Sequence, residues 1–340
     1  MCPATGARRV AAEEPSHDNY GGGVTTPTVF SVPLRSRFRG LTVREGVLLQ
    51  GAAGWGEFSP FWDYDDAESL AWWRAAREAA DTGWPDPVRM SIPVNVTIPA
   101  VGPELAARIV AESGCGTAKV KVAEVGQEFA EDLARVAAVR RALGKHGRIR
   151  IDANGAWDVP TAIERIRRLD RAARGLEYVE QPCRTVAELA AVRRAVDVLI
   201  AADESIRRSE DPLEVVRAEA ADIAILKVQP LGGVRAAFEL AERLGLPVVV
   251  SSALESSIGL AAGLALAAAL PELPYACGLA TAALLERDVV AEPLLPVDGE
   301  IAVRRPEPAP RLLAAAGADE GVIASWRERI AAVSSLEASR

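Results

Sequence analysis

From about residue 91 onward, short apolar runs alternate with longer stretches in which apolar residues recur every three or four positions. The short runs are typical of buried strands, and stretches such as Glu131 to Leu143 are typical of amphipathic helices. Eight strands that alternate with helices favour a parallel barrel over an open, doubly wound sheet, which stays an alternative because the eighth strand is weak. The expected strands are Ile92–Ile98, Ala118–Val122, Ile149–Asp152, Tyr178–Glu180, Val198–Ala202, Ile223–Val228, Pro247–Ser251 and one near Ala276.

The segment before this alternation has a different pattern. Three short strands are expected over Val29–Leu34, Val47–Gln50 and Gly54–Phe58, and a helix is expected over Asp65–Ala80, where apolar residues have helical spacing. Strands followed by a helix resemble a small α+β domain.

The two ends of the chain are distinct from both blocks. Residues 1–27 are polar and glycine-containing, which predicts a disordered tail. After about residue 293 the alternation stops, and two helical stretches are expected to pack back on the N-terminal block. The predicted division is therefore a tail at 1–27, an α+β unit at 28–90, a barrel at 91–292 and a C-terminal segment at 293–340.

Composition excludes several classes of function. The chain of 340 residues has a net charge of −8, which argues against general nucleic-acid binding. It contains no apolar run long enough to cross a membrane and no apolar segment typical of a signal peptide. Four cysteines without a CxxC pair suit a reducing cytoplasm, and two histidines make histidine triads and zinc sites poor interpretations. The sequence carries no prediction of oligomeric state.

Acidic residues close three successive predicted strands: Asp152, Glu180 and Asp203. They are separated by about one strand plus one helix, so a parallel barrel brings them to one rim. An isolated Asp after a strand is usually a turn residue, but three in consecutive units are harder to explain in that way. Three converging carboxylates repel one another unless a cation lies among them. Oxygen ligands without histidine or thiol favour Mg²⁺, with Mn²⁺ as a substitute.

Lysines flank these carboxylates. Lys119 and Lys121 share one strand face, and two such positions lie roughly 6.6 Å apart along the backbone. Like charges in a partly desolvated site depress a lysine pKa and help to make one lysine a base. The Lys-x-Lys pattern alone is more typical of a solvated edge strand, but the acidic strand ends that follow in register favour the catalytic interpretation. Lys227 ends a strongly apolar strand and would stand across the barrel mouth from Lys121. This arrangement suits removal of a proton α to a carboxylate by a lysine, with a metal ion stabilising the enediolate.

The order and spacing of these residues resemble the enolase superfamily, in its muconate-lactonizing branch. The resemblance covers about Val29 to Leu295 and implies a (β/α)7β barrel with an α+β capping domain whose loops close over the metal site. The matching motifs are Lys119-Val120-Lys121, Asp152-Ala153-Asn154, Glu180-Gln181-Pro182, Asp203-Glu204-Ser205 and Lys227.

Further motifs are similar to members of that branch that dehydrate a cyclohexadiene carboxylate in menaquinone synthesis, so a small-molecule carboxylate substrate is implied. They are Pro33-Leu34-Arg35, Phe38-Arg39-Gly40, Trp55 to Pro60, Ile92 to Asn95 and Ser251 to Ser257. A departure is the segment from Gly278 to Ala282, which carries less glycine than related enzymes and bears on substrate contacts.

The resemblance also implies a role for each residue. Lys121 would be the base and then the acid that helps hydroxide leave, Lys227 would stabilise the enediolate, and Lys119 would tune Lys121 and touch the substrate carboxylate. Three further residues are expected at the substrate: Ser252 in the strand-seven segment at the succinyl arm, Asn154 on the face of Asp152, and Arg39 in the lid loop.

Two alternative functions compete with dehydration. The first is an N-succinylamino acid racemase of the same branch, in which both lysines act as bases on opposite faces of the substrate. The second is a catalytically silent barrel kept as a binding or scaffold protein. The presence of all six charged residues disfavours the silent barrel, and the lid and strand-seven motifs favour dehydration over racemisation.

Overall fold

The computed structural model describes residues 27–339. The expected disordered tail therefore lies, apart from residue 27, outside the described residues. The predicted boundaries between the units of the chain stay a prediction.

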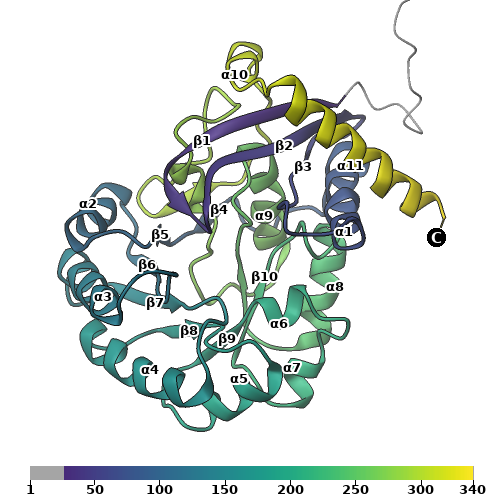
Figure 1. Cartoon of the computed structure of the whole chain (residues 1–340). Coiled ribbons are helices and arrows are strands. Elements are labelled where there is room, and N and C mark those ends of the chain that lie inside the picture. The colour runs from purple at the N-terminus through teal and green to yellow at the C-terminus, as the bar shows by residue number, and fades with distance from the viewer. Residues whose placement is uncertain (1–26, 340) are drawn as a thin grey trace, which may run out of the picture.

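The first unit is an antiparallel sheet in the order β1-β2-β3, followed by a helix (Figure 1). Its first strand buries alternate residues, Phe30, Val32 and Leu34, so one face packs inward and the other meets solvent. The sheet is longer than predicted because the strands continue through polar residues toward a hairpin tip. The elements are β1 (Thr28–Phe38), β2 (Leu41–Gly51), β3 (Gly54–Phe58), α1 (Asp66–Arg77) and the π-helix η1 (Glu78–Thr82).

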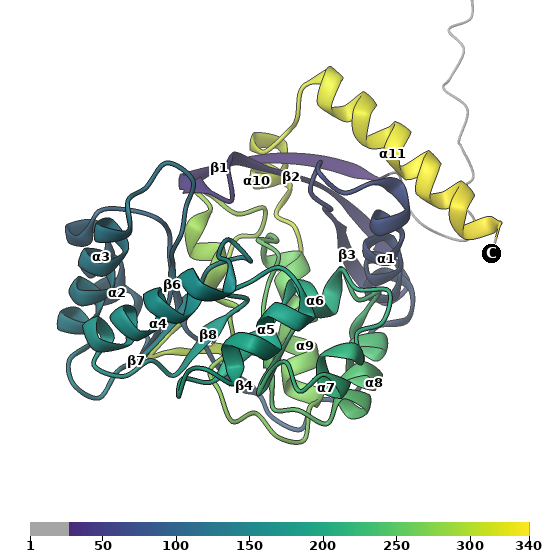
Figure 2. The ribbon, with the colours of Figure 1, turned by 60° about the horizontal axis from the view of Figure 1, so that its bottom comes forward.

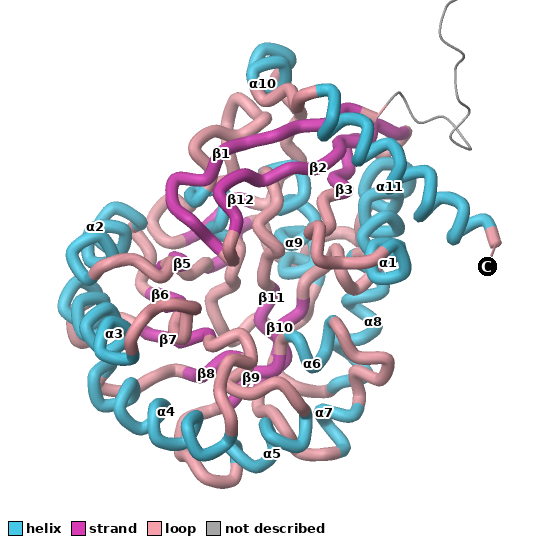
Figure 3. The backbone as a smooth tube through the Cα atoms, in the orientation of Figure 1, coloured by secondary structure: helices cyan, strands magenta, loops and turns pink. Residues whose placement is uncertain are grey.

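The second unit is a curled parallel sheet in the order β5-β6-β7-β8-β9-β10-β11, with helices on its outer side (Figures 1 and 3). The strands are β5 (Val96–Ile98), β6 (Thr117–Lys121), β7 (Arg148–Asp152), β8 (Tyr178–Glu180), β9 (Ile200–Ala202), β10 (Ile223–Leu226) and β11 (Val248–Val250). The helices are α2 (Pro103–Ser113), α3 (Phe129–Leu143), α4 (Val159–Ala173), α5 (Val186–Arg193), α6 (Glu204–Arg207), α7 (Glu214–Arg217), α8 (Val234–Leu244) and α9 (Ser257–Ala269).

Two isolated parallel bridges close this sheet into a barrel. Val94 pairs with Cys277 next to β5, and Ser251 pairs with Gly278 next to β11. The weak eighth strand expected near Ala276 is therefore a short connection that completes the ring. The predicted barrel with an α+β cap is confirmed, and an open sheet is excluded.

The prediction of one strand over Ile92–Ile98 is wrong. The chain forms two strands there, β4 (Ser91–Pro93) and β5, and β4 pairs antiparallel with β12 (Glu300–Ala302) outside the barrel. Val94 and Asn95 separate them: Pro93 still pairs with Glu300, whereas Val94 forms an isolated parallel bridge with Cys277. The change of partner after Pro93 is a tertiary effect that an apolar run does not reveal.

The chain after the barrel returns to the first unit. It forms the 3₁₀ helix η2 (Ala280–Leu284), then β12, α10 (Pro310–Ala315) and α11 (Glu320–Ala338). Helix α11 packs along α1 (Figure 2). Its Trp326 is fully buried, with its ring 5.8 Å from that of Phe58, and the Trp73 indole donates to Glu337 over 2.9 Å. None of the helices in the described part of the chain combines the length and apolar character that crossing a membrane requires.

The hydrophobic core of the first unit extends into the barrel. Its buried cluster joins Phe30 and Trp72 to three residues that follow β11, namely Ala253, Leu254 and Ile258. The loop after the seventh barrel strand is thus packed against the antiparallel unit, so the two units meet at the end of the barrel that carries the charged residues.

Candidate active site

Strand register places the charged residues side by side at one end of the sheet. Lys121 pairs with Asp152, and Asp152 pairs with Glu180, across β6, β7 and β8. Asp203 follows β9 directly, and Lys227 follows β10. All of these side chains are buried or nearly so. Burial of a charged group is costly unless it is paired, and these residues pair with one another.

Lys119 bridges two of the carboxylates. Its Nζ donates to Asp152 Oδ2 over 3.1 Å and to Glu180 Oε1 over 2.9 Å. Burial lowers the pKa of Lys119, but the carboxylates of Glu180 and Asp152 raise it by more, so this pKa lies well above its ordinary value. Lys119 is therefore a fixed positive charge and a poor base.

The pKa of Lys121 is shifted in the opposite direction, below its ordinary value. Its Nζ donates to Asp152 Oδ2 over 2.6 Å and to Asn154 Oδ1 over 2.7 Å, and it lies 5.5 Å from the centre of the Phe38 ring. Burial is the largest cause that lowers the pKa of Lys121; Asp152 opposes it and the charge of Lys119 adds to it. The direction is the one expected from the sequence, although desolvation contributes more than the neighbouring lysine.

The pKa values of Glu180 and Asp152 are shifted in opposite directions. Burial first, and then the charge of Asp152, raise the pKa of Glu180 to about 7 despite the opposing charge of Lys119. Burial also disfavours the charged form of Asp152, but Lys121 and Lys119 outweigh it and hold the pKa of Asp152 well below its usual range. The raised pKa of Glu180 comes mainly from burial, and the negative charges of Asp152 and Asp203 add to it; a bound cation would offset that repulsion.

In the described part of the chain, no three His, Cys, Asp or Glu side chains are arranged as they stand to hold a metal ion. The carboxylates contact basic side chains instead: Asp152 and Glu180 contact Lys119, and Asp203 contacts Lys227 over 2.5 Å. The donor set itself fits a hard divalent cation, because its members are oxygen donors from adjacent strand ends whose charges act on one another. The metal ion expected from the sequence therefore requires these carboxylates to exchange some lysine contacts for metal contacts.

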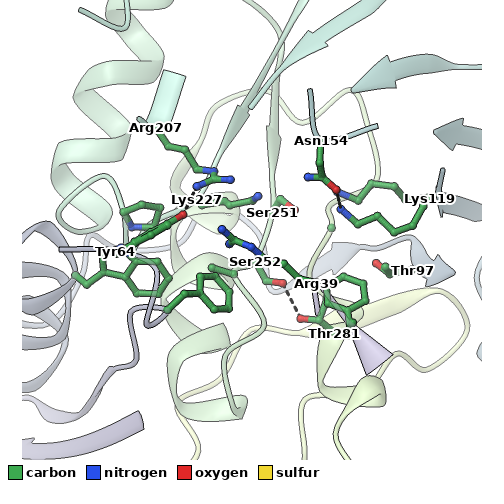
Figure 4. Close-up of a pocket in the computed structure, with 17 residues that line it drawn as sticks. Arg39, Tyr64, Thr97, Lys119, Asn154, Arg207, Lys227, Ser251, Ser252 and Thr281 are labelled. Carbon is green, nitrogen blue, oxygen red and sulfur yellow. Dashed lines mark hydrogen bonds between the residues drawn. The ribbon is translucent and has the colours of Figure 1, made fainter. Parts of the chain in front are cut away.

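A pocket opens between the barrel end and the first unit, and Lys121 and Lys227 both line it. Figure 4 shows Lys227 and Lys119 approaching this pocket from opposite sides. The sequence pattern predicts that Lys121 and Lys227 stand on opposite faces of the substrate, and both line this pocket.

The three residues expected at the substrate all line this pocket. Ser252 Oγ and Thr281 Oγ1 are 2.7 Å apart (Figure 4). Arg39, from the hairpin tip after β1, has its guanidinium carbon 4.1 Å from the centre of the Phe61 ring and pairs with Asp63 over 3.2 Å. Asn154 accepts from Lys121, as described above. The pocket thus combines barrel residues with residues of the first unit.

Sequence reasoning missed Arg207 and Tyr64. Arg207 donates to Asp203 Oδ1 over 2.9 Å and to Glu204 Oε1 over 2.6 Å, and its guanidinium also donates to the Tyr64 hydroxyl (Figure 4). The i,i+4 spacing of Asp203 and Arg207 was a usable signal, although such spacing is more often a helix-surface pair. No sequence signal pointed to Tyr64, which comes from the loop before α1.

Comparison with known proteins agrees with this architecture. The family described as Enolase C-terminal domain-like matches residues 103–309, and the family described as Enolase N-terminal domain-like matches residues 29–80. Among solved structures, muconate lactonizing enzyme from Pseudomonas putida is 21% identical, covering 87% of this chain and 99% of that one, with a TM-score of 0.72. L-Ala-D/L-Glu epimerase from Bacillus subtilis is 23% identical, covering 84% and 96%, with a TM-score of 0.70. At these identities the structures show the shared fold alone.

Curated relatives are much more similar in sequence. An o-succinylbenzoate synthase from Thermobifida fusca (strain YX) is 66% identical over 307 residues, which cover 90% of this chain and 95% of that protein. An o-succinylbenzoate synthase from Mycobacterium tuberculosis (strain ATCC 25618 / H37Rv) is 53% identical over 309 residues, which cover 91% and 93%.

Fold and site together define an enolase-superfamily barrel enzyme. Within that superfamily, the chain belongs to the o-succinylbenzoate synthase family, whose members are hydro-lyases.

Proposed function

We propose that this chain dehydrates 2-succinyl-6-hydroxy-2,4-cyclohexadiene-1-carboxylate to 2-succinylbenzoate in menaquinone biosynthesis, in the cytoplasm. The observation that carries the mechanism is the position of Lys121, half-buried at the pocket and held by Asp152 and Asn154, with a lowered pKa. The relatives named above support the dehydration, and they do not favour the racemase alternative.

Lys121 is the group that moves protons in this proposal. Its neutral amine takes the proton α to the substrate carboxylate, and the electron pair of that C–H bond moves toward the carboxylate to give the enediolate. The pair then returns to form a C=C bond of the ring. The C–O bond then breaks, and the ammonium group of Lys121 returns the proton to the departing hydroxide as water, which leaves an aromatic ring. A lowered lysine pKa serves both steps because a neutral amine is available and its conjugate acid is a competent donor.

Asp152, Glu180 and Asp203 are the proposed ligands of Mg²⁺, for which Mn²⁺ can substitute. Enolase-superfamily members bind a divalent metal ion, and the crowded carboxylates described above suit it. When bound, this ion supplies positive charge to the oxygens of the substrate carboxylate.

The other two lysines supply fixed charge. Lys119, with its raised pKa, stays an ammonium group beside Glu180 and is proposed to touch the substrate carboxylate and to tune Lys121. Lys227 is proposed to stabilise the enediolate from the face opposite Lys121. Neither residue needs to gain or lose a proton in this scheme.

Ser252, Asn154 and Arg39, which also line the pocket, are proposed to bind the substrate. Ser252, on the loop after β11, is assigned to the succinyl arm, and its hydroxyl is oriented by Thr281. Asn154 is assigned to the ring end of the substrate beside Lys121, and Arg39 adds a cation from the hairpin tip. A dicarboxylate substrate matches this surplus of positive groups.

The direct test is an absorbance assay of the purified chain with the cyclohexadiene substrate and Mg²⁺. Saturable formation of 2-succinylbenzoate is expected, and no turnover above the non-enzymatic rate would refute the proposal.

A further inference from the structure

The loop that joins β11 to α9, residues 251–257, has an unusual backbone. Ser252 and Ala253 line the active-site pocket, and Leu254 has a φ of 66°, in the left-handed region that residues with a side chain rarely adopt. A backbone of this kind persists only where its surroundings hold it. Glu255, in the loop itself, accepts from the Ala253 N–H over 2.9 Å, and two further side chains that hold the loop come from the antiparallel unit.

Arg44, on β2, binds two carbonyl groups of this loop. Its Nε donates to the Leu254 carbonyl over 2.9 Å, and its Nη2 donates to the Ala253 carbonyl over 3.5 Å. Only 2% of Arg44 is exposed, so these contacts replace water as partners of the guanidinium group. The same Nη2 donates to Ser59 Oγ over 2.8 Å.

Glu57, on β3, binds the other end of the loop, where α9 begins. Its Oε2 accepts from the Ser256 N–H over 3.1 Å and from the Gly259 N–H over 3.0 Å. Ser59 Oγ donates to Glu57 Oε1 over 2.7 Å, so Ser59 links Glu57 to Arg44. A Cβ atom at Gly259 would lie 2.6 Å from Glu255 Cβ and 3.0 Å from Glu57 Cδ, so a side chain there would crowd both glutamates.

We propose that Arg44 and Glu57 are positioning residues through which the antiparallel unit sets the shape of the 251–257 loop and thereby the placement of Ser252 and Ala253 at the substrate. They touch no reacting atom and act only through the loop. The inference rests on the proposed function in one respect, the assignment of Ser252 to the substrate.

This role has a kinetic signature that general destabilisation lacks. The loop holds a part of the substrate remote from Lys121, and an interaction made equally in the ground state and the transition state affects KM and leaves kcat unchanged. A variant that merely unfolds part of the population lowers the active fraction and leaves KM of the folded fraction unchanged.

The test uses two variants of different severity. Glu57→Gln places an amide NH₂ among the N–H and O–H donors of Ser256, Gly259 and Ser59. Ser59→Ala removes only the hydroxyl that links Glu57 to Arg44. The loss of one buried hydrogen bond corresponds to about a tenfold change, so we expect KM to rise about tenfold or more in Glu57→Gln and about threefold in Ser59→Ala. In both variants kcat stays within about threefold.

Arg140→Met is the matched control. Arg140 is also buried and also binds carbonyl groups, those of Ala173 and Gly147, which lie outside the pocket. It should lose stability with KM unchanged. If Glu57→Gln does not fold, Ser59→Ala decides the matter alone.

Hydrogen exchange gives a second readout that needs no substrate. The amides of Ser256 and Gly259 should exchange faster in Glu57→Gln, whereas those of α3 and α4 should not change. In a double-mutant cycle, Ser252→Ala and Glu57→Gln should have less than multiplicative effects on KM, because both act through one contact.

Unchanged KM in both variants, or unchanged exchange at the start of α9, would overturn the positioning role. An inactive wild-type protein would refute the proposed function instead, and the exchange experiment would still decide whether Glu57 holds the loop.

Discussion

The ammonium group of Lys121 lies 2.6 Å from Oδ2 of Asp152, its direct partner on the neighbouring strand. The same oxygen accepts from Lys119 over 3.1 Å, so two lysines share one carboxylate. The lysines nevertheless differ, because Lys119 also contacts Glu180 and has a raised pKa, whereas burial lowers the pKa of Lys121. Asp152 thus sits between a permanent cation and the proposed base.

The first prediction concerns that base. Lys121→Arg keeps the positive charge, but arginine does not give up its proton near neutral pH. General acid–base catalysis typically contributes 10²–10⁴-fold, so we expect kcat to fall on the order of 10³-fold. Steady-state dehydration kinetics measure this. Lys145→Arg, at an exposed site, is the matched control and should retain wild-type activity. An arginine variant at position 121 with most of its activity would rule out the base role.

The arrangement of Lys121, Asp152 and Glu180 could be predicted because it follows from two local rules. Side chains alternate along a strand, and parallel strands linked by helices end at one rim. Both rules are visible in the sequence without knowledge of tertiary contacts. The barrel was predicted for the same reason. The division of the expected strand Ile92–Ile98 was missed because the strand partner of Pro93 is Glu300, more than two hundred residues away.

Glu57, Arg44 and Tyr64 could not be predicted in this way. Glu57 is a charged residue in a short strand, a position that usually faces solvent. It is nevertheless buried against Ser256, 199 positions further along the chain. Tyr64 meets Arg207 across 143 positions. Contacts between the antiparallel unit and the barrel depend on how the two units pack together, and no residue spacing within either unit encodes that packing.

The second prediction concerns the metal ion. Removal of divalent ions with EDTA should abolish dehydration, and addition of Mg²⁺ or Mn²⁺ should restore it, because the ion proposed at Asp152, Glu180 and Asp203 supplies the positive charge that stabilises the substrate anion. Activity is measured before stripping, after exhaustive dialysis and after titration with each ion. Asp152→Asn should need far more Mg²⁺ for half-maximal activity. Undiminished turnover by the stripped protein would contradict the proposed metal site.

The third prediction concerns stability and pH. Burial first, and then the charge of Glu57, raise the pKa of Glu255 to about 7 in the folded protein, above its ordinary value of 4.5. The folded state therefore binds the Glu255 proton more tightly than the unfolded state. The contribution of Glu255 to stability increases as the pH falls from above 7 toward the unfolded pKa. From pH 8 to pH 6 this amounts to about 1 kcal/mol.

Urea denaturation of the wild type and of Glu255→Gln at both pH values isolates the contribution of Glu255 together with its coupling to Glu57, because carboxylates remote from Glu255 titrate equally in the two proteins. The free energy of unfolding of the wild type, taken relative to the variant, should be greater at pH 6 than at pH 8. The same difference at both pH values would mean that Glu255 titrates normally.

The last prediction separates dehydration from racemisation. A dehydratase that moves protons only through Lys121 needs Lys227 as a cation, whereas a racemase needs Lys227 to exchange protons on the opposite face. Lys227 contacts Asp203 over 2.5 Å, so its ammonium group already has a carboxylate partner. We therefore expect rapid dehydration of the cyclohexadiene substrate and little racemisation of N-succinyl amino acids.

Deuterium exchange in D₂O measures this directly, with each enantiomer of an N-succinyl amino acid incubated separately and its α-proton followed by NMR. Exchange should be slow, or confined to the enantiomer whose α-proton faces Lys121. Lys227→Arg, which keeps the cation without a transferable proton, should leave that exchange in place, whereas Lys121→Arg should abolish it. Rapid exchange of both enantiomers, with kcat/KM near that for dehydration and lost in Lys227→Arg, would show that Lys227 is a working base and that the chain is also a racemase.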